Sequence, residues 1–325
     1  MSQSPHHITP LTHRTVASST AVGAGRFAPS PSGDLHLGNL RTALLAWLFA
    51  RSTGRRFLMR VEDLDRVRPG AREQQLADLR ELGLDWDGDV VVQSDRRQHY
   101  QDAVARLESA GLTYECFCTR REILKAPSAP HAPHGAYPGI CRNLTSEERG
   151  ARRAGGRPPA LRLRADVGSF AIDDLLHGSY SGMVDDLVLR RGDGTPAYNL
   201  AVVVDDAAQG VDQVVRGDDL LSSAPRQAYL AGLLGLTAPQ YAHVPLALDQ
   251  EGRRLAKRAG AVTLGDQKAL GRTPRQVLGM LAASLRLTAP DEEADLAGLL
   301  DRFEPSRLPR EPWVITLPTT PSQSP

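Results

Sequence analysis

The chain is short of cysteine, lysine and long apolar runs, and each shortage argues against a class of protein. Cys116, Cys118 and Cys141 are the only cysteines among 325 residues, too few for the disulfide framework of a small secreted protein. No apolar run approaches the roughly 18 residues of a membrane span, and none near the N-terminus resembles a signal-peptide core. We therefore expect a cytoplasmic protein without a membrane partner.

The chain also has no large excess of charge of either sign: it has 39 basic and 38 acidic residues, and its net charge is +1. Any nucleic-acid partner must therefore be held by a local basic patch. Lysine supplies only Lys125, Lys257 and Lys268, which makes each of the three a candidate for a specific role. The length allows two or three domains, and 41% hydrophobic residues are typical of a globular protein.

The most informative stretch that is present is residues 26–41, RFAPSPSGDLHLGNLR. Pro29 and Pro31 fix φ and remove two backbone donors, so this loop cannot merge with the elements beside it. A helical apolar pattern begins at Leu40, and the unpaired amides and dipole at its start favour an anion such as phosphate. His36 lies at that helix start, where an imidazole can donate a hydrogen bond to phosphate oxygens.

The rest of the chain alternates strand and helix patterns, which predicts an α/β fold. The first helix presents one buried face and ends at Gly54, and the strand Arg56–Val61 follows it to complete a β-α-β unit. Acidic residues follow that strand from Glu62. We expect further helices at residues 69–82, 96–110, 223–235, 274–286 and 291–303, and strands at 114–118, 186–190, 196–204, 211–216 and 242–248.

The three cysteines fall in one short region, in a pattern that suits a metal site. Cys116 and Cys118 lie on one side of an extended segment, and Cys141 follows, which gives three thiolates for a tetrahedral zinc ion. On chemistry alone, His131 or His134 is preferred as the fourth ligand. Three buried free cysteines remain the alternative.

Residues 142–164 form the most basic window of the chain, with seven arginines against Glu147 and Glu148. We interpret this window as a contact for an RNA backbone. A solvated helix face is the alternative.

The sequence PSPSGDLHLGN, residues 29–39, resembles the first signature of class I aminoacyl-tRNA synthetases, in the form found in the glutamyl enzymes. The resemblance covers about residues 25–270. It implies a Rossmann-like nucleotide-binding fold with a zinc-bearing insertion. The second signature of the family matches residues 254–258, where Ala256 replaces the usual serine and removes a hydroxyl contact to ATP.

The resemblance also implies roles for individual residues. His36 and Lys257 would be catalytic, and MgATP would be bound by His36, Gly38, Asn39, Arg254, Leu255, Ala256, Lys257 and Arg258. Glutamate would be bound by Arg26, Phe27, Ala28, Pro29, Ser30, Glu62, Tyr198 and Arg216. One structural Zn²⁺ would be held by Cys116, Cys118, Tyr137 and Cys141, since Tyr137 has the spacing of the family's fourth ligand.

By this resemblance the chain divides into a disordered tail (1–22), the first half of the catalytic domain (23–112), the zinc-bearing insertion (113–185), the second half with the lysine loop (186–270), a short helical segment (271–316) and a second tail (317–325). Few residues follow the lysine loop, so we expect no anticodon-binding domain. This truncated form is similar to the glutamyl-queuosine tRNA(Asp) synthetases.

That similarity implies a monomer that activates L-glutamate with ATP and transfers it to queuosine in the anticodon loop of tRNA(Asp). Three alternatives stay open. They are a small glutamyl-tRNA synthetase that charges a tRNA 3′ end, an enzyme that adenylates glutamate for an acceptor other than tRNA, and a catalytically inactive tRNA-binding module.

Overall fold

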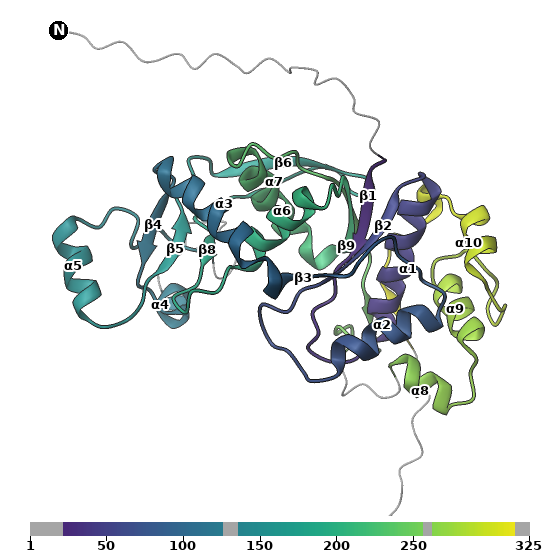
Figure 1. The fold of residues 1–325 in the computed structure, drawn as a ribbon. Coiled ribbons are helices and arrows are strands. Elements are labelled where there is room, and N and C mark those ends of the chain that lie inside the picture. Colours follow the sequence, from purple (N-terminus) through teal and green to yellow (C-terminus); the bar gives the residue numbers. More distant parts are fainter. Residues whose placement is uncertain (1–21, 126–135, 256–261, 316–325) are drawn as a thin grey trace, which may run out of the picture.

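A parallel sheet runs through the centre of the protein in the computed structural model, which describes residues 22–125, 136–255 and 262–315 (Figure 1). Its first three strands have the order β1-β2-β3 and are all parallel. Ala24 in β1 also forms a parallel bridge with Val211, beside β9. This bridge extends the sheet to the order β3-β2-β1-β9-β10-β6-β7, in which only β7 is antiparallel to its neighbour. The strands are β1 (Ala24–Phe27), β2 (Arg56–Val61), β3 (Val91–Val92), β6 (Ser169–Asp174), β7 (Gly178–Met183), β9 (Gln213–Gly217) and β10 (Gln240–Val244).

Several expected positions lie outside the described residues. They are most of both terminal tails, His131, His134, Ala256, Lys257 and Arg258.

Helix α1 (Leu37–Ser52) connects β1 to β2, and most of its residues are buried. The sequence predicts a single buried face, but every residue from 43 to 50 is buried. The sheet covers one side of α1, and the C-terminal helices α9 (Pro274–Ala283) and α10 (Leu296–Arg302) cover the other (Figure 1). Phe49 packs edge-on against Phe303 with ring centroids 5.1 Å apart, so residues from both ends of the chain share one core.

The opposite side of the sheet carries α6 (Tyr198–Ala208) and α7 (Ala224–Leu233), with α3 (Arg97–Ser109) packed on α6. The prediction of a strand at residues 196–204 is wrong, because most of these residues lie in α6. Leu200 to Val204 are all buried, so their run of apolar side chains has no polar face from which the helical period could be seen.

The cysteine-bearing region forms a separate three-stranded sheet in the order β4-β5-β8, at one end of the molecule (Figure 1). Its elements are β4 (Thr113–Cys116), α4 (Arg120–Lys125), α5 (Ser146–Ala154), β5 (Ala160–Leu163) and β8 (Val188–Arg190). The two sheets do not divide at the expected boundary between residues 185 and 186. Strand β8, after the boundary, pairs with β5 of the small sheet, and β6, before the boundary, pairs with β10 of the central sheet.

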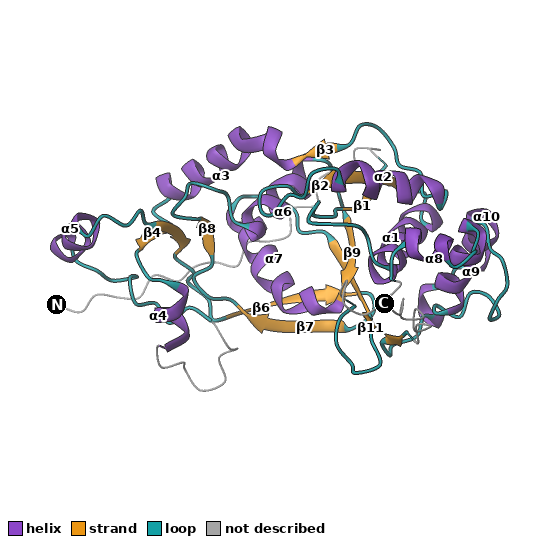
Figure 2. Cartoon of the chain, turned by 90° about the horizontal axis from the view of Figure 1, so that it is seen from below, coloured by secondary structure: helices purple, strands orange, loops and turns teal. Residues whose placement is uncertain are grey.

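The remaining elements are α2 (Ala71–Glu81), α8 (Leu264–Ala269), the 3₁₀ helices η1 (Gln93–Arg96), η2 (Asp218–Ser223) and η4 (Pro305–Arg307), and the strand pair β11 (Ala247–Leu248) with β12 (Trp313–Val314). Figure 2 shows α8, α9 and α10 gathered beside α1. The expected strand at 242–248 is two strands, β10 and β11, separated by Pro245. Within the described residues, no helix combines the length and apolar content that crossing a bilayer requires.

Candidate active site

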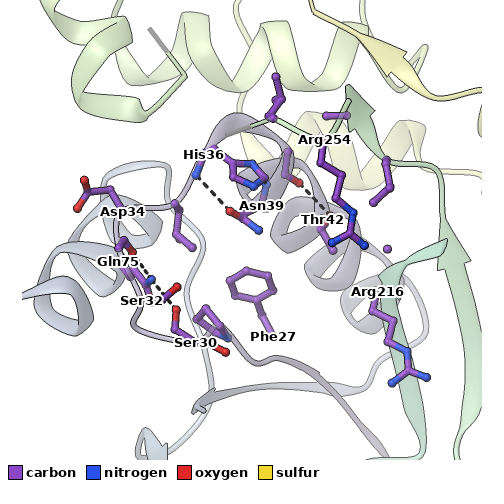
Figure 3. A pocket seen from close by; sticks show the side chains of 18 of the residues that line it. Phe27, Ser30, Ser32, Asp34, His36, Asn39, Thr42, Gln75, Arg216 and Arg254 are labelled. Carbon is purple, nitrogen blue, oxygen red and sulfur yellow. Dashed lines mark hydrogen bonds between the residues drawn. The ribbon is translucent and has the colours of Figure 1, made fainter. Parts of the chain in front are cut away.

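A cavity of about 520 Å³ opens where β1 and β9 end (Figure 3). It is lined by the loop after β1, the start of α1, the segment after β9, and residues on both sides of 256–261. A crevice at the carboxyl ends of parallel strands is the usual ligand site of an open α/β sheet. The cavity therefore occupies the usual ligand position of such a sheet.

His36 caps α1 and lines this cavity. Its Nδ1 accepts a hydrogen bond from the Asn39 amide at 3.2 Å, and Asn39 Oδ1 accepts one from the His36 amide at 3.2 Å. Since Nδ1 is an acceptor, a neutral ring carries its proton on Nε2. Burial, assisted by the nearby positive charge of Arg254, lowers the pKa of His36 to about 4. His36 is thus a neutral donor at ordinary pH.

We expect His36 to stay neutral, with its proton on Nε2, between about pH 6 and 8. The unfolded chain takes up this proton near pH 6.5 and the folded chain only near pH 4, so this group makes folding less favourable as pH falls through that window. Nitrogen-detected NMR of the His36 ring during an acid titration measures both properties. A midpoint near the ordinary histidine value, or a proton on Nδ1, would contradict the assignment.

The amides at the start of α1 are less available than the sequence predicts. The Leu37 amide donates to the Val262 carbonyl at 2.7 Å, and the Asn39 amide is used by the His36 cap. Those two groups cannot serve a ligand without losing these bonds. In their place, the His36 ring offers a side-chain donor at the same helix end.

Gly38 permits the close packing of this helix start. A Cβ at Gly38 would lie 3.0 Å from the Ala247 Cβ and 3.1 Å from the His36 ring. A larger residue would displace either β11 or the imidazole. Gly38 therefore acts through the backbone, while Asn39 holds the ring.

The residues that flank the lysine loop come back to the same cavity. Leu255 and Val262, on either side of 256–261, both line it, and Thr263 forms an antiparallel bridge with His36. Arg254 forms an ion pair with Asp219 at the cavity wall. The described residues on either side of 256–261 therefore lie at the same cavity, beside the start of α1.

Arg216 occupies the other end of the cavity, and Figure 3 shows its guanidinium pointing away from His36. It is 6% exposed. Its Nη1 donates to Gln227 Oε1 at 2.8 Å, and its Nε donates to His243 Nε2 at 3.0 Å. The two ends of the cavity thus differ: one offers a helix cap and a neutral imidazole, the other a buried cation.

Arg26 lies behind the cavity in a buried cluster of charges that includes two residues the sequence analysis missed, Arg60 and Asp206. Asp206 Oδ1 accepts from Arg26 Nε at 3.2 Å and from Arg60 Nη1 at 2.8 Å. Arg60 Nη2 also donates to Glu62 Oε1 at 3.2 Å. Burial raises the pKa of Asp206, but Arg26 and Arg60 outweigh it and hold that pKa below the usual value. For Glu62, burial prevails and raises the pKa despite Arg60.

Apart from Arg26, the residues predicted to bind glutamate line two adjoining cavities. Phe27, Ala28, Pro29, Ser30 and Arg216 line the first. Ser30, Glu62 and Tyr198 line a second of about 230 Å³. Tyr198 was expected at a strand end, but it begins α6 and is 42% exposed. Ser30 belongs to both cavities, so it marks their junction.

The predicted metal ligands come together. The sulfur atoms of Cys116, Cys118 and Cys141 lie within 4.8 Å of one another. The Tyr137 hydroxyl lies 3.3 Å from Cys116 Sγ and 3.8 Å from Cys118 Sγ. Ligands at zinc–sulfur distances of about 2.3 Å in a tetrahedron are about 3.8 Å apart. The donor set therefore fits a zinc ion without large movement.

The basic window is in part a structural feature. Arg142 pairs with Asp186, and Arg162 stacks over the Tyr137 ring at 3.6 Å. Arg152 and Arg157 are exposed. An RNA contact is a hypothesis for the exposed arginines, while Arg142 and Arg162 both donate to Asp186, just before β8.

Comparison with known proteins agrees with this geometry. Residues 24–304 match the family described as tRNA synthetases class I (E and Q), catalytic domain. A glutamate tRNA ligase of Elizabethkingia meningosepticum, solved with its amino acid, superposes with a TM-score of 0.76 at 27% identity, over 90% of this chain and 67% of that one.

Two curated relatives cover most of the chain. The glutamyl-Q tRNA(Asp) synthetase of Nocardia farcinica is 69% identical over 93% of this chain and 96% of its own length. The protein of the same name from Cutibacterium acnes is 58% identical over 84% of this chain and 79% of its own length. The chain therefore belongs to the glutamyl-Q tRNA(Asp) synthetases, a family with the class I catalytic domain of the E and Q enzymes.

Proposed function

We propose that this protein activates L-glutamate with MgATP and transfers the glutamyl group to queuosine in the anticodon loop of tRNA(Asp). The observation that carries the proposal is one cavity with two unlike ends. A neutral imidazole at a helix cap, His36, suits a nucleotide phosphate, and a buried guanidinium, Arg216, suits a carboxylate.

In the activation step, a carboxylate oxygen of glutamate attacks the α-phosphorus of MgATP in line, and pyrophosphate leaves with the electron pair of the broken P–O bond. The His36 Nε2–H donates to an oxygen whose charge increases. Lys257 follows Leu255 and precedes Val262 in the sequence, and both of those residues line the cavity; in this proposal its ammonium neutralises charge on the triphosphate. These groups position and stabilise, so the protein needs no nucleophile of its own.

In the transfer step, a hydroxyl of the queuosine ring attacks the activated carbonyl and AMP leaves. The acceptor is a single modified base, which must be splayed out of the anticodon loop to reach the adenylate. The second cavity, with Glu62 and Tyr198, adjoins the first at Ser30 and gives the glutamyl group room beside the nucleotide.

Labelled glutamate, MgATP and tRNA with or without queuosine test the proposal. We expect glutamate-dependent ATP–pyrophosphate exchange without tRNA, and label transfer only to queuosine-containing tRNA(Asp). Periodate treatment separates attachment to the base from attachment to the terminal ribose. Charging of a tRNA 3′ end would favour a small glutamyl-tRNA synthetase, and tRNA binding without exchange would favour an inactive module.

We also propose that Cys116, Cys118, Tyr137 and Cys141 hold one structural Zn²⁺. When bound, zinc would crosslink β4 to the segment before α5, in a region with a small apolar core of its own. The proposal rests on the approach of the four donor atoms described above.

Substituting Cys141→Ser is expected to remove the metal, because a hydroxyl is a much weaker zinc ligand than a thiolate. Mass-spectrometric metal analysis would then fall from one zinc per chain to well below one, and the melting temperature would fall as well. The matched variant Tyr137→Phe decides the fourth ligand, since it weakens binding only if the phenol ligates. Metal-free wild-type protein would contradict the proposal.

A further inference from the structure

Three hydrogen-bond acceptors, none of them a carboxylate, bind the guanidinium of Arg216. A guanidinium has five N–H donors. Within the described residues, Nε donates to His243, one Nη1 hydrogen to Gln227, and Nη2 to the Leu220 carbonyl at 3.4 Å. These three bonds use three of the five donors, so one hydrogen on each terminal nitrogen is available to a ligand. Two such donors on one guanidinium can bind both oxygens of a carboxylate.

His243 lies directly opposite Arg216 in the pairing of β9 with β10. Its Nδ1 is 2.6 Å from Asp174 Oδ2, and neither side chain is exposed. Since the Arg216 Nε is always a donor, His243 Nε2 must be the acceptor, and its proton lies on Nδ1 toward Asp174. Burial lowers the pKa of His243, although Asp174 acts in the opposite direction. A neutral ring is what the acceptor role requires.

Asp174 is fixed in turn by the backbone. Its Oδ1 accepts from the amides of Leu176 at 2.8 Å and His177 at 3.0 Å, and its Oδ2 accepts from the His243 amide at 3.0 Å. The chain Asp174–His243–Arg216 therefore runs from the end of β6 across β10 to the end of β9. Each link has one donor and one acceptor, which allows a single orientation of the guanidinium.

We propose that His243 and Asp174 are positioning residues that orient the Arg216 guanidinium toward the side-chain carboxylate of the amino-acid substrate. The proposal rests on the proposed function, in which Arg216 binds glutamate. Glutamine presents one oxygen and an NH₂ donor to the same pair of donors, so a fixed guanidinium also disfavours the amide. A guanidinium free to turn would lose both affinity and this discrimination.

Two substitutions at one position separate aiming from packing. In His243→Asn the short amide can still bond Asp174 but cannot reach Arg216, whereas the longer amide of His243→Gln places an oxygen near the lost Nε2. Losing a hydrogen bond to a charged group is worth about 1.5–3 kcal/mol. We expect the glutamate KM of His243→Asn to rise roughly 10- to 100-fold in pyrophosphate exchange, with kcat and the ATP KM within about twofold of wild type.

His243→Gln is expected to recover most of that loss, and the preference for glutamate over glutamine should follow the same order in both variants. His99→Gln, on the exposed face of α3, is the control. Equal KM increases in both His243 variants that follow their melting temperatures would overturn the proposal, as would an unchanged KM in His243→Asn. Wild-type protein without glutamate-dependent exchange would overturn the proposed function together with this inference.

Discussion

Replacing His36 with alanine is expected to lower glutamate-dependent ATP–pyrophosphate exchange by roughly 10²- to 10³-fold, the usual effect of removing one donor to a developing charge. The imidazole is held by Asn39 so that Nε2–H is the remaining donor, and the low pKa keeps it neutral. Most of the loss should be in kcat, because the donor is used most strongly as charge shifts on the phosphate.

Alanine also removes a helix cap, which costs about 1 kcal/mol of stability on its own. His36→Asn separates the two effects, since asparagine is a good N-cap residue but has no donor at the Nε2 position. We expect His36→Asn to keep the wild-type melting temperature and still lose activity. Wild-type exchange in His36→Asn would show that the histidine is only a cap.

Replacing Arg60 with methionine is expected to destabilise the fold by about 3–5 kcal/mol, the effect of removing one partner from a buried ion pair. Arg60 is fully buried, and the substitution leaves Glu62 and Asp206 with less compensating charge. Chemical denaturation measures the loss. Arg307→Met, which breaks an exposed pair with Glu304, is the control and should cost about 0–1 kcal/mol.

The deficit of Arg60→Met should shrink as pH falls from about 7 to 5. Without the guanidinium, the pKa values of Glu62 and Asp206 rise in the folded state, so the folded variant takes up protons before the unfolded chain does. A group whose folded pKa is raised gains stability as pH falls. In the wild type, the lowered pKa of Asp206 means that its contribution is lost only under stronger acid. A pH-independent deficit would show that lost packing, not charge, is the cause.

The parts of the site that could be predicted are those encoded in short stretches. The helix start beside His36 and the helix end at Gly54 follow from local backbone rules, and the structure confirms both. The grouping of Cys116, Cys118, Tyr137 and Cys141 was implied by family spacing, and the structure brings these residues together.

The parts that were missed depend on partners far apart in the sequence. Arg60 and Asp206 are 146 positions apart, and His243 and Asp174 are 69 apart. Nothing in the periodicity around either pair distinguishes a buried charge from an exposed one. The strand prediction for 196–204 failed for another reason: residues 200–204 of α6 are all apolar and buried, so no polar face reveals the helical period.

The contact of α1 with the last helices limits how far the enzyme can be shortened at its C-terminus. Arg41 in α1 donates to the Pro245 carbonyl at 2.6 Å and to Ser284 Oγ at 2.9 Å, and Phe49 meets Phe303. A protein that stopped after the lysine loop would leave this helix, and with it the His36 cap, with an uncovered apolar side. Residues 274–303 therefore stabilise α1, and with it the nucleotide end of the site, although none of the residues proposed to bind substrate lies among them.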